Sequence, residues 1–446
     1  MFKTFSQKLN NLISDNRFSE ILTGSAFSLA ARLGGMVFAM LVSILVARVY
    51  GSEMVGVLAI VQAFMMMASI FAVMGTNVSI LRLIPEHIAK HSISSAFRVY
   101  QKIHYSVALV SVLLGGVLFF FADLIAVEVF SKPFISSYIA ITALCVIFRA
   151  LMDLNTQTIR GLRLIRTFAF MQILPHAGML LVMLVMMKLS RQASVPVYAQ
   201  LAAWGMTALI GAVIVSRGFR QRMDPGDVVE SMSIRELIVL SAPMLMTAYM
   251  NFIIGQIGVL ILGIYRPASE VGYYAVAVKL ATLTSFVLLA INSMVAPKFS
   301  ELFYTGRLDE LFYIARKSTK LIFWTTFPIL LLLAVLGRPV LSLFGKSFVA
   351  AYFPMLILVI GQFINSVSGS TGYFMNMTGH QRSFSIIIFS SSALNLILNI
   401  LLIPKFGLYG AALAGMIGLA LWNIWTLLFI KRKFGRSIGY LPFVSL

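Results

Sequence analysis

Long apolar runs alternate with short polar interruptions along most of this chain. An apolar run of about 20 residues is long enough to cross the roughly 30 Å hydrocarbon core of a bilayer as a helix. The pattern predicts twelve membrane-spanning helices, at 20–49, 55–84, 99–122, 134–159, 167–187, 196–216, 234–264, 271–296, 317–336, 350–376, 384–403 and 409–430. We therefore expect an all-α polytopic membrane protein.

The last two predicted spans are joined by the sequence PKFG at 404–407. One helix covering both spans would be about 70 Å long, more than twice the thickness of the hydrocarbon core. The chain must therefore turn back, and Pro404 followed by Gly407 is where the helix is expected to break. Asn395 and Asn399 lie one helical turn apart before this hairpin and are expected to form a packing seam.

The two halves of the chain resemble each other at offsets close to half its length of 446 residues. Three features recur: segment 49–56 at 264–272, Pro85 at the end of the second span as Pro297 at the end of the eighth, and segment 161–168 at 379–384. Six spans followed by six with matching topology indicate parallel repeats related by an axis along the membrane normal.

The expected organisation is therefore a pair of six-helix bundles with a pseudo-two-fold repeat. From the N-terminus, the parts are a cytoplasmic interfacial helix at 1–19, an N-terminal lobe at 20–216, a polar cytoplasmic linker at 217–233, a C-terminal lobe at 234–430 and a cytoplasmic tail at 431–446. Segment 1–19 has apolar residues at helical spacing among cations, which is typical of an interfacial helix rather than a signal peptide.

Composition supports a membrane protein, with 60% hydrophobic and only 11% charged residues. The net charge of +20 does not indicate a nucleic-acid binder, because the basic residues stand isolated between apolar runs. The single Cys145 lies inside an apolar run and forms no intramolecular disulfide, so redox chemistry is not expected.

The basic residues predict orientation. With the N-terminus in the cytoplasm, 24 of the 35 Lys and Arg residues fall on the cytoplasmic side, which satisfies the positive-inside rule and places both termini there. Eight fall on the opposite side: Arg48, Lys132, Lys188, Arg191, Arg266, Arg338, Lys346 and Lys405. The remaining three lie within spans.

Motifs for catalysis, nucleotide binding and metal binding are weak. Gly345-Lys346-Ser347 is half a phosphate-binding loop, but Val340 stands where the pattern needs its first glycine. His87 and His91 have helical spacing, but no cluster of Cys or acidic residues accompanies them, so no metal and no cofactor is expected. The predicted outer loops are too short for a soluble catalytic domain, and we expect no enzyme.

The charges inside the predicted spans carry the most information, because charge at membrane depth commonly lines a polar pathway. Arg149 and Asp153 are spaced as an i, i+4 ion pair on the fourth span. If their role is structural, the two charges neutralise each other. Arg32 on the first span and Lys279 on the eighth have no acidic neighbour in sequence, so they are candidates to line such a pathway. The alternative is that each side chain reaches the membrane surface or has a structural ion-pair partner. Such an excess of cations favours an anionic substrate over a cationic drug.

Three segments make the chain resemble polysaccharide-exporting flippases: NLILNILLIPKFGLYGAALA at 395–414, the whole of 271–311, and ARVYGSEMVGVLAIVQAF at 47–64. The resemblance is to the multidrug/oligosaccharidyl-lipid/polysaccharide exporter superfamily, and within it to Wzx-type O-antigen flippases. It implies two six-helix bundles around a central cavity. Peptidoglycan-precursor flippases are similar but usually have fourteen spans, so the predicted twelve disfavour that branch.

This resemblance implies translocation of an undecaprenyl-diphosphate-linked oligosaccharide across the bacterial cytoplasmic membrane by alternating access, for O-antigen, capsule or exopolysaccharide synthesis. It implies that Arg32 and Lys279 bind the diphosphate, with Arg149 as a third cation. Asp153 is the candidate carrier of a coupling H⁺ or Na⁺. Implied partners are the bilayer and the polysaccharide polymerase and chain-length proteins, and no nucleic acid. The alternatives are a multidrug cation exporter of the same superfamily and a membrane-embedded polysaccharide polymerase or ligase.

Overall fold

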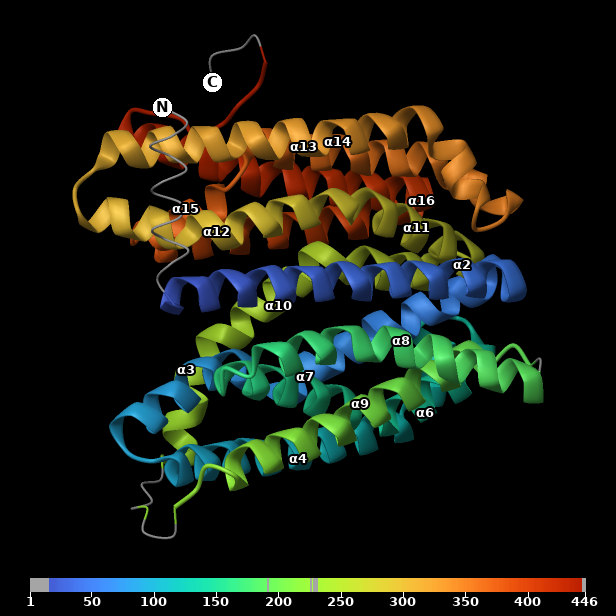
Figure 1. Ribbon diagram of the computed structural model, residues 1–446. Coiled ribbons are helices and arrows are strands. Elements are labelled where there is room, and N and C mark those ends of the chain that lie inside the picture. The colour runs from blue at the N-terminus through green and yellow to red at the C-terminus, as the bar shows by residue number, and fades with distance from the viewer. Residues whose placement is uncertain (1–15, 191, 225–226, 228–231, 443–446) are drawn as a thin grey trace. The chain divides into compact units, whose positions relative to one another are not determined.

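The computed structural model describes residues 16–190, 192–224, 227 and 232–442, and these residues are almost entirely helical (Figure 1). Its α-helices are α2 (Asn16–Val73), α3 (Thr76–Lys90), α4 (Ile93–Phe120), α5 (Ala122–Leu124), α6 (Ser136–Leu144), α7 (Val146–Gly161), α8 (Ile165–Leu189), α9 (Val195–Arg220), α10 (Ile234–Tyr265), α11 (Ala268–Ala281), α12 (Ser285–Tyr304), α13 (Leu308–Ser342), α14 (Tyr352–Ser368), α15 (Thr371–Met377) and α16 (Gln381–Phe434). Short 3₁₀ or π turns lie at Ile125–Val129, Pro133–Ile135, Thr282–Thr284 and Lys346–Ala351. The predicted interfacial helix at 1–19 falls almost wholly outside the described residues.

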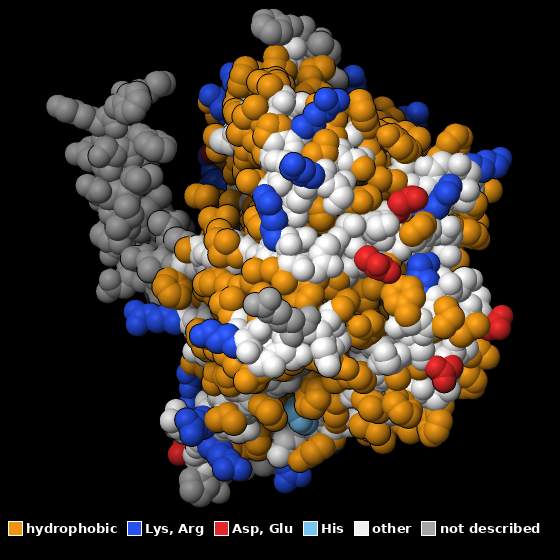
Figure 2. Space-filling model, turned by 90° about the vertical axis from the view of Figure 1, so that its right-hand side faces the viewer, with side chains coloured by type: hydrophobic (Ala, Val, Ile, Leu, Met, Phe, Trp, Pro, Cys, Tyr) orange, Lys and Arg blue, Asp and Glu red, His pale blue; other side chains and the backbone are white. Residues whose placement is uncertain are grey.

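Nine helices of the described chain are long and apolar enough to cross a membrane, and a tenth span results if the bent pair α6 and α7 counts as one. Hydrophobic side chains also cover much of the face shown in Figure 2, as expected for a surface that contacts lipid. The prediction of an all-α polytopic membrane protein is thus confirmed. The count is below the predicted twelve because α2 and α16 each run through a region where two spans were expected.

The chain divides into two compact units, which are described separately. Unit 1 comprises residues up to Val42 together with 72–112 and 147–244, and unit 2 comprises 43–71, 113–146 and 245–446. The helices α2, α4 and α10 contribute several residues to each unit, and α7 contributes Val146 to unit 2 and the rest to unit 1. The predicted division into lobes at 20–216 and 234–430 stays a prediction.

In unit 1, α8 and α9 pack along each other, with Gly178 of α8 in van der Waals distance of Ala203 on α9. Gly211 of α9 lies against Asn155 of α7, where a Cβ would come within 3.0 Å of the Asn155 Cβ. Small residues at such crossings let helix backbones approach closely, which is how membrane helices gain packing energy without a hydrophobic effect between them.

In unit 2, α14 packs against α13, α11 and α16, and α12 packs against α13 and α15. At one end of these helices lies a core of fully or almost fully buried side chains: Phe299, Leu302, Leu311, Phe312, Ala315, Phe374, Met375, Ile430 and Ile438. Ile438 belongs to the segment after α16, so this core fixes the segment 435–442 to the bundle.

The hairpin predicted at 404–407 is confirmed. Gly407 has φ 53° and ψ −127°, a backbone conformation that interrupts the helix within α16. The chain then returns along itself, because the Asn395 amide donates to the Ala414 carbonyl (2.9 Å) and a Cβ on Gly410 would lie 2.4 Å from the Leu402 carbonyl oxygen. The predicted packing seam is also present: Asn399 Nδ2 donates to the Asn395 carbonyl at 2.8 Å, and both asparagines are buried.

Four predicted spans are interrupted where the sequence predicted continuous helix. The second breaks at Met74-Gly75, both with positive φ, and the fourth bends by 45° at Cys145. The eighth contains the 3₁₀ turn Thr282–Thr284, and the tenth breaks at Gly369, with φ 67°. The second and eighth spans correspond in the predicted repeat, as do the fourth and tenth, so the breaks lie in corresponding spans.

Pro85 and Pro297 correct the sequence analysis, which placed them at the ends of spans. Pro85 lies inside α3 and Pro297 inside α12. A proline removes one intrahelical hydrogen bond, and a helix can continue past it where the freed carbonyl finds another partner.

Gly56 of α2 and Gly272 of α11 lie in two segments that resemble each other in sequence, and each closely approaches the other helix. A Cβ on Gly56 would lie 1.7 Å from the Ala268 carbonyl oxygen, and one on Gly272 would lie 2.2 Å from the Ser52 carbonyl oxygen. The contacts are reciprocal, because Ser52 and Ala268 each lie one turn before the glycine of their own helix. Two segments that resemble each other in sequence therefore pack closely against each other within unit 2.

Candidate functional site

Lys279 lies on α11, three residues before the 3₁₀ turn Thr282–Thr284 that interrupts the span. Its side chain is partly buried, and its ammonium group donates a hydrogen bond to the Ser43 hydroxyl of α2, within unit 2. The Thr282 hydroxyl in turn bonds the carbonyls of Val278 (2.8 Å) and Lys279 (3.2 Å). A cation at this position is thus held next to an irregular stretch of a membrane helix, where a hinge is often found.

Arg32 lies on the part of α2 that belongs to unit 1 and is partly buried. One turn further on, a Cβ on Gly35 would lie 3.0 Å from the Gln172 carbonyl oxygen of α8. This close approach fixes α2 against α8 beside Arg32. Arg32 and Lys279 belong to different units, so each is described in its own surroundings.

Arg149 and Asp153 form the ion pair that their spacing predicted. Arg149 Nη1 lies 3.2 Å from Asp153 Oδ1, and the two side chains are 22% and 33% exposed. The guanidinium group also lies 5.6 Å from the ring centre of Trp204 on α9, a cation–π distance. The pair and the tryptophan hold Arg149 between α7 and α9, an arrangement that supports its structural role.

A buried polar chain beside this pair was not predicted. The Tyr100 hydroxyl of α4 donates to Asn155 Oδ1 of α7 at 2.8 Å, and Asn155 Nδ2 donates to the Ala208 carbonyl of α9 at 3.2 Å. His104 Nδ1 lies 3.2 Å from the same hydroxyl. Asn155 follows Asp153 by two residues and is fully buried. The available sequence signal was the clustering of polar residues on α7 after Arg149.

Several polar residues inside the predicted spans make contacts within the protein. Asn365 Nδ2 bonds Gln362 Oε1 on the same helix at 3.3 Å, and the Ser285 hydroxyl of α12 bonds that oxygen at 3.3 Å. Asn251 Nδ2 donates to the Thr247 carbonyl at 3.0 Å, but Asn251 is exposed. The contact between Ser285 and Gln362 joins α12 to α14, which is the commoner role of amides in membrane bundles.

The structural setting of the histidine pair suits a packed helix face. His87 is buried in α3, and its ring lies 5.4 Å from that of His91. Glu86 beside it pairs with Lys90 (2.7 Å) and Arg82 (3.2 Å), and the hydrogen bond from Lys90 is the main reason that the pKa of this carboxyl lies below its usual value. Within the described residues, no three His, Cys, Asp or Glu side chains are grouped to hold a metal ion.

The fold, with its interruptions inside helices of membrane-spanning length, is shared with known structures. The chain is similar over 92% of its length to a structure described as "Lipid II flippase MurJ, inward closed conformation", covering 87% of that chain at a TM-score of 0.72 and 15% identity. It is equally similar to an inward-facing multidrug resistance MATE family transporter of the MOP superfamily, over 91% and 98% of the two chains, at a TM-score of 0.73 and 13% identity. At these identities the likeness shows the fold, which flippases and drug transporters share.

The family model described as "Polysaccharide biosynthesis protein" matches residues 21–303, more than half of the chain. The chain belongs to this family, which confirms the resemblance seen in the sequence. Two relatives from Haloferax volcanii are similar: "Probable flippase AglR", 28% identical over 191 residues, and "Probable low-salt glycan biosynthesis flippase Agl15", 27% identical over 197 residues. Each match covers 42% of this chain. The matched region spans 39% of the length of AglR and 41% of the length of Agl15, so the chain spans less than half of these relatives. Both relatives are named as flippases, the class of protein that the sequence resembled.

Proposed function

We propose that this protein is a flippase that moves an undecaprenyl-diphosphate-linked oligosaccharide from the cytoplasmic to the outer leaflet of the bacterial cytoplasmic membrane. The product would serve O-antigen, capsule or exopolysaccharide synthesis, together with a polymerase and chain-length proteins. The observation that carries the proposal is membership of the polysaccharide biosynthesis family, since the fold is shared with multidrug transporters. The names of the two Haloferax relatives point the same way.

We propose twelve spans with both termini in the cytoplasm. Twelve follow if α2 is split at Gly51 and α16 at Gly407, the two glycines with non-helical backbone, and if the bent α6–α7 pair counts as one span. Each half of a split helix keeps at least 22 residues, enough to cross the hydrocarbon core. The repeated breaks and the Gly56–Gly272 contact support two lobes of six spans each, which move in alternating access.

Lys279 and Arg32 are proposed to bind the diphosphate, with Arg149 as a further cation. Two features support this assignment. Lys279 donates a hydrogen bond to the Ser43 hydroxyl, a neutral group that does not itself cancel the positive charge. Arg149, in contrast, already faces Asp153, so its share in binding would be smaller. Asp153 is proposed to carry the coupling H⁺ or Na⁺, because an acid at membrane depth is the usual device for proton relay.

The proposal is tested in cells that lack their own repeat-unit flippase. Expression of this chain should restore surface polysaccharide, and Lys279→Ala or Arg32→Ala should abolish the restoration at a normal protein level in the membrane. Lys405→Ala is the matched control, because Lys405 is an exposed cation of the hairpin at 404–407. Normal polysaccharide in both variants would overturn the binding role. Drug resistance conferred on a sensitive host, without polysaccharide, would instead support the multidrug exporter.

A further inference from the structure

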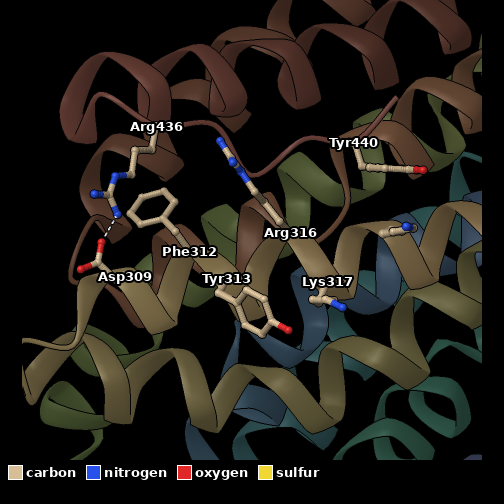
Figure 3. Close-up of a pocket in the computed structure, with 8 residues that line it drawn as sticks. Asp309, Phe312, Tyr313, Arg316, Lys317, Arg436 and Tyr440 are labelled. Atoms are coloured by element: carbon tan, nitrogen blue, oxygen red, sulfur yellow. Dashed lines mark hydrogen bonds and ion pairs between the residues drawn. The ribbon is translucent and has the colours of Figure 1, made fainter. Parts of the chain in front are cut away.

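A pocket of about 430 Å³ opens at the N-terminal end of α13, within unit 2 (Figure 3). One wall is the first part of α13, and the other is the segment 435–442 after α16. Four of its lining residues are cations, three are aromatic and one is acidic: Arg316, Lys317, Lys320, Arg436, Phe312, Tyr313, Tyr440 and Asp309. A pocket of this composition suits an anion that is attached to an apolar body.

The wall formed by segment 435–442 is fixed in place. Ile438 is fully buried in the aromatic core of unit 2, and the Tyr440 backbone N–H donates to the Val367 carbonyl at 2.9 Å. Arg316 Nε donates to the Ser437 carbonyl at 2.7 Å, and Trp324 Nε1 donates to the Tyr440 hydroxyl at 3.3 Å. The pocket is therefore a preformed feature of the fold.

The charges of the pocket are only partly neutralised from within it. Figure 3 shows Arg436 and Asp309 facing each other as an ion pair beside the Phe312 ring. The ammonium groups of Lys317 and Lys320 lie over the rings of Tyr313 (5.4 Å) and Tyr440 (5.6 Å), and both lysines are exposed. Cation–π contact orients a lysine without removing its charge, so both remain able to bind a phosphate group.

The exposed face of α13 continues from this pocket as an apolar stripe. At 100° per residue, the pocket residues Tyr313, Lys317 and Lys320 share one face with Trp324, Leu331 and Val335. All six are exposed. The part from Trp324 to Val335 is about 16 Å long, roughly half the thickness of the hydrocarbon core. Cations and tyrosines at one end, a tryptophan at the boundary and aliphatic residues beyond it match the layers of one membrane leaflet.

We propose that the pocket binds the phosphate headgroup of a membrane lipid, whose hydrocarbon chains lie along Trp324, Leu331 and Val335. This site is separate from the proposed substrate cations Arg32, Lys279 and Arg149, and it does not depend on flippase activity. The apolar stripe argues for a lipid over a free anion. Two lipids carry the required chemistry, an acidic phospholipid of the surrounding leaflet and a polyprenyl phosphate.

The test is native mass spectrometry of the full-length protein in detergent, titrated separately with phosphatidylglycerol, phosphatidylcholine and undecaprenyl phosphate. The wild type should bind at least one of the two anionic lipids more tightly than phosphatidylcholine. The double variant Lys317→Gln/Lys320→Gln should weaken that binding by about thirtyfold, since each cation near an anionic headgroup contributes a factor of about five to ten. Whichever anionic lipid shows the loss is the source of the headgroup.

Two further variants control the experiment. Lys431→Gln/Lys433→Gln removes two exposed lysines of the last turn of α16 that do not line the pocket, and it should leave lipid binding unchanged. Lys317→Arg/Lys320→Arg keeps the charge and should retain binding, which separates electrostatics from a folding defect. Binding that is equal in the wild type and the glutamine variant, or a loss that is the same in the Lys431/Lys433 control, would overturn the proposal.

Discussion

Lys279 illustrates how a single charge is accommodated at membrane depth. An ammonium group in a span is costly unless polar groups or water surround it. Here the Ser43 hydroxyl accepts its hydrogen bond, and the neighbouring 3₁₀ turn gives the helix an irregular backbone that membrane proteins tolerate where it is buried in protein or lines a cavity. The residue therefore has both a structural contact and the charge that an anionic substrate needs.

These two roles of Lys279 are separable. Ser43→Ala removes the hydrogen bond and keeps the charge of Lys279. Transport of the lipid-linked oligosaccharide should stay within about threefold of the wild type, because one hydrogen bond to a neutral partner contributes little net free energy. Lys279→Gln removes the charge, and transport should fall more than about tenfold, as expected for losing a charge-assisted contact. Transport rate per protein in the membrane is the measurement. Equal losses in the two variants would show that Lys279 acts only through Ser43.

The Arg149–Asp153 pair is tested by removing one charge and then both. Asp153→Asn leaves Arg149 without its anionic partner and should lower the free energy of unfolding by about 1 kcal/mol, a modest value because both side chains are partly exposed. Arg149→Met/Asp153→Leu should recover stability. If Asp153 also carries the coupling ion, transport driven by a proton or sodium gradient will be lost in Asp153→Asn and retained in Asp153→Glu. A stable Asp153→Asn protein with full gradient-driven transport would contradict the coupling role.

For single residues, the sequence predicted contacts between neighbours on one helix. It did not predict contacts between residues that are far apart in the chain. The Arg149–Asp153 pair follows from an i, i+4 spacing on one helix, so the sequence predicted it. The Ser43 contact of Lys279 and the Tyr100–Asn155 bond join residues far apart in the chain. Their registers depend on how α2 meets α11 and how α4 meets α7, and no spacing within one segment encodes that.

At the scale of elements, the reciprocal approach of α2 and α11 depends on two glycines. Gly56→Ala or Gly272→Ala would place a methyl group within 2.2 Å of a carbonyl oxygen of the facing helix. Each substitution should therefore lower the free energy of unfolding by about 1–3 kcal/mol, the usual cost of overpacking. Unfolding in a denaturing-detergent titration measures the change.

Gly116→Ala is the matched control for the glycine pair. Gly116 lies in α4, also within unit 2, and a Cβ there would meet no other atom within 4 Å. Alanine at this site should change the free energy of unfolding by less than about 1 kcal/mol. A Gly56→Ala variant as stable as Gly116→Ala would show that the helices separate without cost.

The sequence predicted where apolar segments lie better than where helices break. Length arithmetic located the hairpin at 404–407, because the 47 residues from 384 to 430 would be too long as one helix to fit across the membrane. The breaks at Gly75, Cys145, Thr282–Thr284 and Gly369 leave hydrophobicity unchanged, so a pattern of apolar runs cannot detect them. Their placement in corresponding spans became visible only when the backbone was known.

At the scale of the whole molecule, the topology is the first expectation to test. In a Cys145→Ser background, a single cysteine replacing Lys405 should react with an impermeant thiol reagent added outside intact cells, because the hairpin is predicted to be extracytoplasmic. A cysteine replacing Arg382 should react only after permeabilisation. Both positions are exposed in the structure, so access depends on the side of the membrane. Labelling in the reverse pattern would contradict the positive-inside prediction.

The charge balance of the molecule links this topology to its substrate. Family membership identifies a polysaccharide biosynthesis protein, and the fold is one that drug transporters share. The two proposed substrate cations, Arg32 and Lys279, are carried by spans of different units, and an anionic diphosphate is the ligand that such cations favour. The charge of the substrate therefore distinguishes the two proposed functions, because a flippase would bind an anionic diphosphate and the drug exporter a cationic drug.

The most direct measurement is lipid translocation by the purified protein in liposomes. Undecaprenyl-diphosphate-linked oligosaccharide placed in one leaflet should become accessible to an impermeant glycosidase on the opposite side faster with the wild type than in protein-free vesicles. Lys279→Gln should reduce the rate more than tenfold, with Lys405→Ala unchanged. Translocation no faster than in protein-free vesicles, under both a proton and a sodium gradient, would contradict the proposed function.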